Sequence, residues 1–158
     1  MSRPAFDTMS FRIAEFLASP GRRLPVASTL QGKHDPETLC MVESIELDGE
    51  GFAQLSTMYF EVTLRARLVQ PCRRCLAPVE STLEIDESFE VQVPPGSESI
   101  DLLPIVLRLV LSSREPNVLC KPDCLGLCPA CGINLNRHPD HKCELDRAEK
   151  RTLRDFLA

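Results

Sequence analysis

Apolar and polar residues alternate along three stretches in the middle of the chain, and this period of two is typical of half-buried β-strands. The clearest stretch runs from Val79 to Val93, where apolar side chains share one face and mostly acidic ones share the other, with only Glu87 out of step. Another covers 55–69, and a third begins at Leu39 and is closed by DGEG at 48–51, which predicts a turn. Three consecutive strands with short links predict an antiparallel meander with one solvated face.

The same alternation assigns a face to each side chain. On the middle strand, the apolar face consists of Val62, Leu64, Ala66 and Leu68, and the other face of Thr63, Arg65 and Arg67. On the first strand, Leu39, Met41, Ile45 and Leu47 alternate with Cys40, Val42, Ser44 and Glu46. We expect the helix described next to cover the apolar side of this sheet.

The apolar period changes after residue 100 and predicts a helix over 102–111. Asp101 is expected to be its N-cap, and Pro104 falls in the first turn, where proline is tolerated. The run is apolar almost all round, so it should pack across the inner face of the sheet. A second, polar helix is predicted over 144–157. Its basic stripe, a candidate phosphate-facing surface or simply a solvated face, consists of Arg147, Lys150, Arg151 and Arg154.

The first forty residues carry weaker signals. They predict a short strand or helix at 11–17, a stop at Pro20-Gly21 and an extended piece at 24–30. The predicted fold class is therefore α+β: an antiparallel β-meander packed against one apolar helix, followed by a Cys-rich zinc-knuckle segment. We predict two parts, an α+β core over 1–118 and a Cys-rich segment with the terminal helix over 119–158.

The composition indicates which chemistry the cysteines can carry out. The chain has 158 residues, eight of them cysteine, and a net charge of -5. It shows neither a secretory signal nor an apolar run long enough to span a bilayer, so we expect a soluble, cytoplasmic protein. Closely spaced cysteines in a reducing compartment more often bind metal or carry out redox chemistry than form structural disulfides.

Seven of the eight cysteines fall into short motifs. Cys72 and Cys75 form one CxxC in the link between the second and third strands, and Cys128 and Cys131 form another, followed by Gly132. Two residues between cysteines allow both thiolates to bind one ion, and a glycine suits the positive φ of such turns. The remaining candidate ligands are Cys120, Cys124, His141 and Cys143, with His138 as an alternative to His141. We therefore predict one or two zinc ions per chain.

The sequence allows three partitions of these ligands. Cys120, Cys124, Cys128 and Cys131 would make one local site. A zinc-ribbon site would instead join Cys72 and Cys75 to Cys128 and Cys131. The third partition uses every ligand in two tetrahedral sites, of which one is Cys72, Cys75, Cys120 and Cys124 and the other is Cys128, Cys131, His141 and Cys143. We favour the third, which leaves Cys40 as an ordinary small apolar residue.

The stretches PCRRCLAPVE, IDLLPIVLRLVLSS and LCKPDCLGLCPACGINLN, with the late Cys143, resemble the bacterial YceD family, the large ribosomal RNA subunit accumulation proteins. The resemblance covers about residues 11–143. Two departures are the polar Ser112–Glu115 segment after the helix and the His141-Lys-Cys143 motif, where many members have Cys-x-Cys. The resemblance implies a cytosolic factor in the accumulation or processing of large-subunit ribosomal RNA, and we expect this factor to bind its target rather than to catalyse a reaction.

Charge distribution indicates where such a factor would bind. Four arginines cluster between 65 and 75 and are candidate RNA or partner contacts: Arg65, Arg67, Arg73 and Arg74. Residues 80–101 hold seven acids and no Lys or Arg, a face that would suit a basic ribosomal protein instead.

The rival hypothesis for the function is a thiol-redox or zinc-sensing regulator. A hydrolase is disfavoured because the sequence shows no nucleophile beside a base and no catalytic carboxylate pair, and we expect neither a small-molecule substrate nor a membrane partner.

Overall fold

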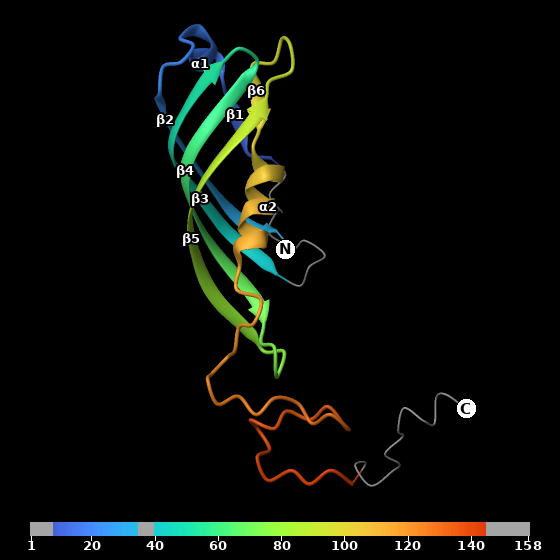
Figure 1. Ribbon diagram of the computed structural model, residues 1–158. Coiled ribbons are helices and arrows are strands. Elements are labelled where there is room, and N and C mark those ends of the chain that lie inside the picture. The colour runs from blue at the N-terminus through green and yellow to red at the C-terminus, as the bar shows by residue number, and fades with distance from the viewer. Residues whose placement is uncertain (1–7, 35–39, 145–158) are drawn as a thin grey trace, which may run out of the picture. The chain divides into compact units, whose positions relative to one another are not determined.

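A computed structural model describes residues 8–34 and 40–144 (Figure 1). The chain divides into two compact units. The sheet unit comprises residues 1–70 and 80–116, and the cysteine unit comprises residues 71–79 and 117–158. The sequence-based division at 118/119 kept the 71–79 link with the core, whereas the structure groups this link with the Cys-rich segment. The predicted helix at 144–157 and its basic stripe lie, apart from Glu144, outside the described residues.

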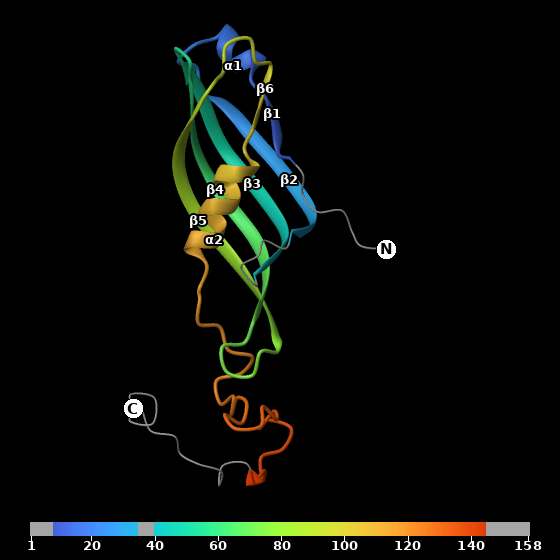
Figure 2. The same ribbon diagram turned by 90° about the vertical axis from the view of Figure 1, so that its right-hand side faces the viewer.

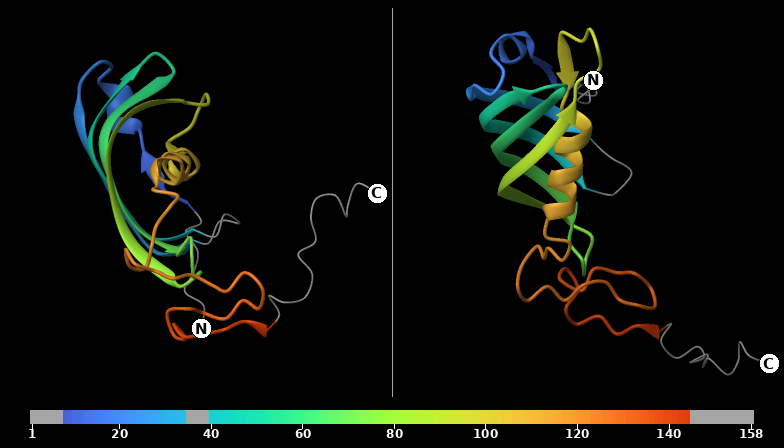
Figure 3. Two further views of the ribbon diagram at one scale, coloured as in Figure 1. Left: turned by 60° about the horizontal axis from the view of Figure 1, so that its bottom comes forward. Right: turned by 45° about the horizontal axis from the view of Figure 1, so that its top comes forward.

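The sheet unit is α+β, as predicted. Its main sheet has four strands in the order β2 (Leu24–His34), β3 (Met41–Gln54), β4 (Thr57–Pro71) and β5 (Pro78–Gln92). A second, two-stranded sheet pairs β1 (Ser10–Arg12) with β6 (Ser99–Asp101), and α1 (Ala14–Ala18) follows β1. The helix α2 (Leu103–Ser113) lies across the concave face of the curved main sheet (Figures 2 and 3).

The core lies between α2 and this concave face. Alternate β4 residues Val62, Leu64, Ala66 and Leu68 are buried as predicted, and Arg65 and Arg67 are exposed. The buried helix residues Leu103, Val106 and Val110 belong to the same apolar cluster. The prediction of a helix covering one face of a meander is confirmed. No helix in the described part of the chain is long and apolar enough to cross a membrane.

The predicted turn at 48–51 is wrong, because β3 continues through it to Gln54. Gly49 pairs with Val62 on one side and with Val26 on the other. A Cβ at Gly49 would collide with the Glu61 carbonyl oxygen, so glycine here permits close strand packing. The chain reverses instead at Leu55, which has φ 55°.

The expected faces are also wrong at the start of β3. A β-bulge between Val42 and Ser44 shifts the register against β4, so that Glu43 is the extra residue and the alternation changes phase. Cys40 and Val42 are therefore fully buried, while Met41 is half-buried.

The start of α2 differs slightly from the prediction. Leu102, rather than Asp101, is the N-cap residue, and Pro104 occupies the first turn as predicted. Asp101 still serves the helix end, because its Oδ1 accepts hydrogen bonds from the backbone N–H groups of Leu103 at 3.0 Å and Met9 at 2.8 Å. The carboxylate thus ties the helix start to the segment before β1.

Candidate metal centres

The cysteine unit brings the predicted ligands together in two groups of four. The four-thiol group consists of Cys72, Cys75, Cys120 and Cys124, and the thiol-imidazole group consists of Cys128, Cys131, His141 and Cys143. Within each group, the ligand atoms all lie within 4.8 Å of one another. Within the described residues 8–34 and 40–144, no other set of three or more potential metal ligands converges in this way. The third sequence partition is the one that the structure shows.

Backbone hydrogen bonds shape the turn that carries the first CxxC. The Cys72 N–H donates to the Ala77 carbonyl at 2.7 Å, and the Leu76 N–H donates to the Cys72 carbonyl at 2.9 Å. Leu76 adopts φ 64° to complete the turn, and its side chain is exposed. The turn therefore directs both thiols to the same side.

The second half of the four-thiol group is docked against this turn. The Arg73 N–H donates to the Val118 carbonyl at 2.9 Å, and the Leu127 N–H donates to the Arg74 carbonyl at 3.2 Å. The Arg74 guanidinium also donates to the Cys124 carbonyl at 2.9 Å. These bonds bring the 117–127 segment beside residues 71–79, so that four thiols distant in sequence converge.

The four-thiol group is largely enclosed. Cys72, Cys75 and Cys124 are at most 7% exposed, and Cys120 is the exposed member. Sulfur atoms form close pairs, 3.8 Å between Cys72 and Cys124 and 3.5 Å between Cys75 and Cys120. Four thiolates in this arrangement are a donor set that suits tetrahedral zinc.

The environment favours the thiolate at two of these sulfurs. Burial raises the pKa of the Cys72 thiol, but backbone donors at Cys75, Cys120 and Arg74 outweigh it and bring the pKa to about 6. Cys124 has a lowered pKa, chiefly because the Asn136 side chain donates to its sulfur. The hydrogen bond with Cys75 and burial raise the pKa of Cys120 to about 12, so metal binding here would displace a proton.

A tight turn shapes the thiol-imidazole group. The Gly132 N–H donates to the Cys128 carbonyl at 2.8 Å, and the Cys128 N–H donates to the Ile133 carbonyl at 2.8 Å. Gly132 has φ 75°, as the sequence predicted for the residue after the second cysteine. Leu127 and Asn134 then form an antiparallel bridge, so residues 127–134 make a small hairpin.

The thiol-imidazole group is more open than the four-thiol group. Cys128 is buried, Cys131 is exposed, and His141 and Cys143 are half-buried. The Cys131 sulfur lies 3.3 Å from His141 Nε2. Backbone donors at Cys131 and Ala130 lower the pKa of Cys128 to about 6. Three thiolates and one imidazole also suit zinc, and four ligands fill its tetrahedral shell.

Other candidate ligands stay outside both groups. Cys40 is fully buried in the core of the sheet unit, where burial raises the pKa of its thiol although the charge of Arg114 opposes the shift. His138 belongs to neither group, although its carbonyl accepts the His141 N–H at 3.1 Å. Sequence reasoning missed Asn136, whose Nδ2 lies 3.3 Å from the Cys124 sulfur. In the sequence, the role of Asn136 is indicated only by a short polar side chain within the GINLN stretch, which many surface loops also contain.

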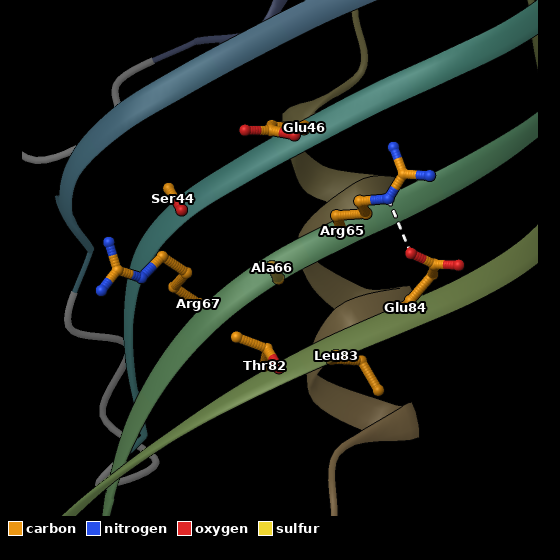
Figure 4. Close-up of a pocket in the computed structure, with 8 residues that line it drawn as sticks. All are labelled: Ser44, Glu46, Arg65, Ala66, Arg67, Thr82, Leu83 and Glu84. Atoms are coloured by element: carbon orange, nitrogen blue, oxygen red, sulfur yellow. Dashed lines mark hydrogen bonds and ion pairs between the residues drawn. The ribbon is translucent and has the colours of Figure 1, made fainter.

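The four candidate contact arginines belong to both units. Arg65 and Arg67 line a groove of about 410 Å³ on the solvent-facing side of the sheet, with α2 behind it (Figure 4). Arg65 is bound to Glu84 at 2.6 Å across the strands. In the cysteine unit, Arg73 donates to the Asn117 side chain at 2.8 Å. Among the described residues, Arg65 is thus the candidate with an ion pair, Arg73 and Arg74 donate to neutral acceptors, and Arg67 shows neither kind of contact.

The acidic face of β5 has partners within the sheet. Glu84 binds Arg65, and Asp86 accepts a hydrogen bond from the Thr63 hydroxyl at 2.6 Å. Such a ladder of cross-strand pairs is what a solvated sheet face ordinarily shows.

Comparison with known proteins gives relatives in mycobacteria. The chain is 30% identical to uncharacterized proteins of Mycobacterium bovis and of two strains of Mycobacterium tuberculosis. The alignment covers 90% of this chain and 78% of each relative. No family model and no solved structure matches the chain.

Proposed function

The chain belongs to the same protein family as these mycobacterial relatives, and we propose that it is a non-enzymatic zinc-binding factor in large-subunit ribosomal RNA accumulation and ribosome biogenesis. It acts in the cytoplasm by binding ribosomal RNA. The observation that carries the metal-binding part is the convergence of eight ligand side chains into two groups of four. The ribosomal part is supported by the resemblance to the YceD family in the cysteine motifs.

The ligand sets favour a structural role for the metals. In zinc enzymes, the ion keeps a position open for water or substrate, whereas closed sets of four protein ligands stabilise a fold. Each group here supplies four side-chain ligands. By coordinating the thiolates and the imidazole, the metals would cross-link the loops and fix the residues that these loops carry.

The arginines support an RNA contact. Arg73 and Arg74 lie between two ligands of the four-thiol group, Cys72 and Cys75, so a bound ion would hold their backbone in place. Arg67 presents positive charge on the exposed face of β4, and Arg65 lies on the same face, paired with Glu84. Because the net charge is -5, binding to phosphates has to be local and sensitive to salt.

A filter-binding titration with large-subunit ribosomal RNA over a series of salt concentrations tests this contact. Replacing all four arginines by alanine should weaken binding and reduce the salt slope by about 0.7–0.9 for each phosphate that is no longer neutralised. Arg22→Ala is the matched control, because Arg22 is also exposed and lies outside the cluster. Binding that ignores salt and the four replacements refutes the RNA contact. If a basic ribosomal protein binds instead, the chain acts as an assembly adaptor.

A thiol-redox or zinc-sensing regulator is the second candidate, favoured by the short sulfur pairs and by exposed Cys120 and Cys131. A peroxide would accept two electrons from a thiolate pair, and formation of the S–S bond would release the metal. Alkylation of the zinc-loaded protein separates the two functions. Thiols that are protected until a chelator is added support the structural role, whereas immediate reaction favours the regulator.

A further inference from the structure

One side chain connects the two metal groups. Asn136 lies in the chain between two ligands of the thiol-imidazole group, Cys131 and His141, yet its amide contacts a ligand of the four-thiol group. Its Nδ2 donates to the Cys124 sulfur at 3.3 Å, and its Oδ1 accepts the Leu125 N–H at 2.9 Å. Both ends of the amide are thus used at the four-thiol group.

The hairpin of the thiol-imidazole group puts Asn136 in this place. The turn from Cys128 to Gly132 reverses the chain, and the bridge between Leu127 and Asn134 aligns the two arms. Beyond the bridge, the Leu135 N–H donates to the Gly126 carbonyl at 2.9 Å. Asn136 comes next and meets Cys124.

The amide itself is held in position. The Asn136 N–H donates to the Asn134 Oδ1 at 2.9 Å, which fixes the backbone from which the side chain projects. Asn136 is half-buried and Cys124 is 2% exposed, so water competes little for this hydrogen bond. A donor to a thiolate ligand orients the sulfur and offsets part of its charge when a metal binds.

We infer that Asn136 is a positioning residue that couples the two metal sites, so that filling the thiol-imidazole group increases the affinity of the four-thiol group. A metal in the thiol-imidazole group would close the 127–134 hairpin and hold Asn136 against Cys124. Because coupling between binding sites is reciprocal, filling the four-thiol group also favours the thiol-imidazole group. The inference rests on the metal binding proposed above.

A matched pair of variants isolates the hydrogen bond. Asn136→Asp keeps the oxygen that accepts the Leu125 N–H but removes the donor to Cys124. Asn134→Asp is the control, because it introduces the same charge on a half-buried neighbour and keeps the oxygen that accepts the Asn136 N–H, and no contact of Asn134 with a ligand sulfur is seen among the described residues. Co²⁺ is the probe, since four thiolates and three thiolates with one imidazole give different absorption bands. We expect Asn136→Asp to lower the Co²⁺ affinity of the four-thiol group about 10- to 100-fold and the control to lower it by much less.

A double-mutant cycle tests the coupling itself. Cys131→Ser with His141→Ala disables the thiol-imidazole group without touching a ligand of the four-thiol group. This change should weaken Co²⁺ binding at the four-thiol group about 10-fold in the natural chain, but about twofold or less when Asn136 is already Asp. Equal weakening in both backgrounds, or an Asn136→Asp effect no larger than the control, overturns the inference.

Hydrogen exchange gives a second measurement that does not depend on metal binding at the four-thiol group. In a chain with Cys72→Ser and Cys75→Ser, adding Zn²⁺ fills the thiol-imidazole group alone. Exchange of the Leu125 N–H should then slow, because its acceptor is the Asn136 side chain. Unchanged exchange contradicts the coupling. If both groups bind metal but do so independently, only this inference is overturned. If the chain binds no metal at all, the proposed function is overturned as well.

Discussion

Removal of the metals should unfold the cysteine unit and leave the sheet unit folded, because different forces hold the two units. In the described part of the sheet unit, 22 buried residues form a continuous apolar core. In the cysteine unit, the buried residues of the apolar cluster are themselves ligands, namely Cys72, Cys75 and Cys124. In the described part of this unit, the apolar cluster is therefore built around the metal ligands themselves.

The sizes of these contributions decide the outcome. Four half-buried side chains pack around those cysteines: Ala77, Val79, Leu119 and Leu127. A fully buried apolar side chain contributes about 1.5–3 kcal/mol, so this half-buried set adds only a few kcal/mol. One structural zinc in a small domain contributes about 10–16 kcal/mol near pH 7. Metal binding therefore dominates the free energy of folding of the cysteine unit.

Amide hydrogen exchange with and without a strong chelator measures the effect residue by residue. In the cysteine unit, the reporters are the N–H groups of Leu127, Cys128 and Leu135, all hydrogen-bonded to carbonyls. In the sheet unit, the internal controls are Leu47 and Leu64, which are paired between β3 and β4. Chelation should bring the reporters to the exchange rate of an unstructured peptide and leave the controls protected.

Two results would refute this reasoning. Reporters that stay protected in chelator would show that hydrogen bonds and packing hold the cysteine unit without metal. Loss of protection at Leu47 and Leu64 as well would show that the sheet unit depends on the metals.

Three further predictions concern both units. Gly49→Val should lower the free energy of unfolding of the sheet unit by at least about 1–3 kcal/mol in urea denaturation, because its Cβ would collide with the β4 backbone; an unchanged urea midpoint would contradict this. Leu55→Asn should raise that free energy by up to about 1 kcal/mol, because Leu55 has φ 55° and is 92% exposed; a lower urea midpoint would contradict the strain argument. The pKa values of Cys72 and Cys128 are about 6 against an ordinary 9.0, so acidification from pH 9.0 through about 6 protonates thiols that the folded unit holds as thiolates. Their contribution to the stability of the metal-loaded cysteine unit should therefore decline as the pH falls from 9.0 toward 6; a flat profile in pH-dependent exchange of that unit would contradict this.

The sequence predicted the features that depend on neighbouring residues. Alternation located β4 and β5 within two residues, and the change of period located α2. The CxxC spacing and the requirement for four ligands per ion led to the partition that the structure shows. In each case the signal lies in short-range pattern or in simple coordination chemistry.

The features that sequence reasoning missed depend on contacts between distant segments. DGEG has turn-forming residues, but pairing of Gly49 with β2 and β4 keeps it extended. The bulge at Glu43 arises from register against β4, which no local pattern encodes. Asn136 is a short polar residue like many others until the hairpin brings it to Cys124. Long-range pairing decided all three.

Metal content of the untagged, purified protein tests the central claim most directly. We expect two zinc ions per chain, one bound by four sulfurs and one by three sulfurs and one nitrogen, as measured by elemental analysis and X-ray absorption at the zinc edge. One ion per chain would contradict the two-group assignment. A chain without zinc that also fails to take it up under reducing conditions would contradict the metal-binding function altogether.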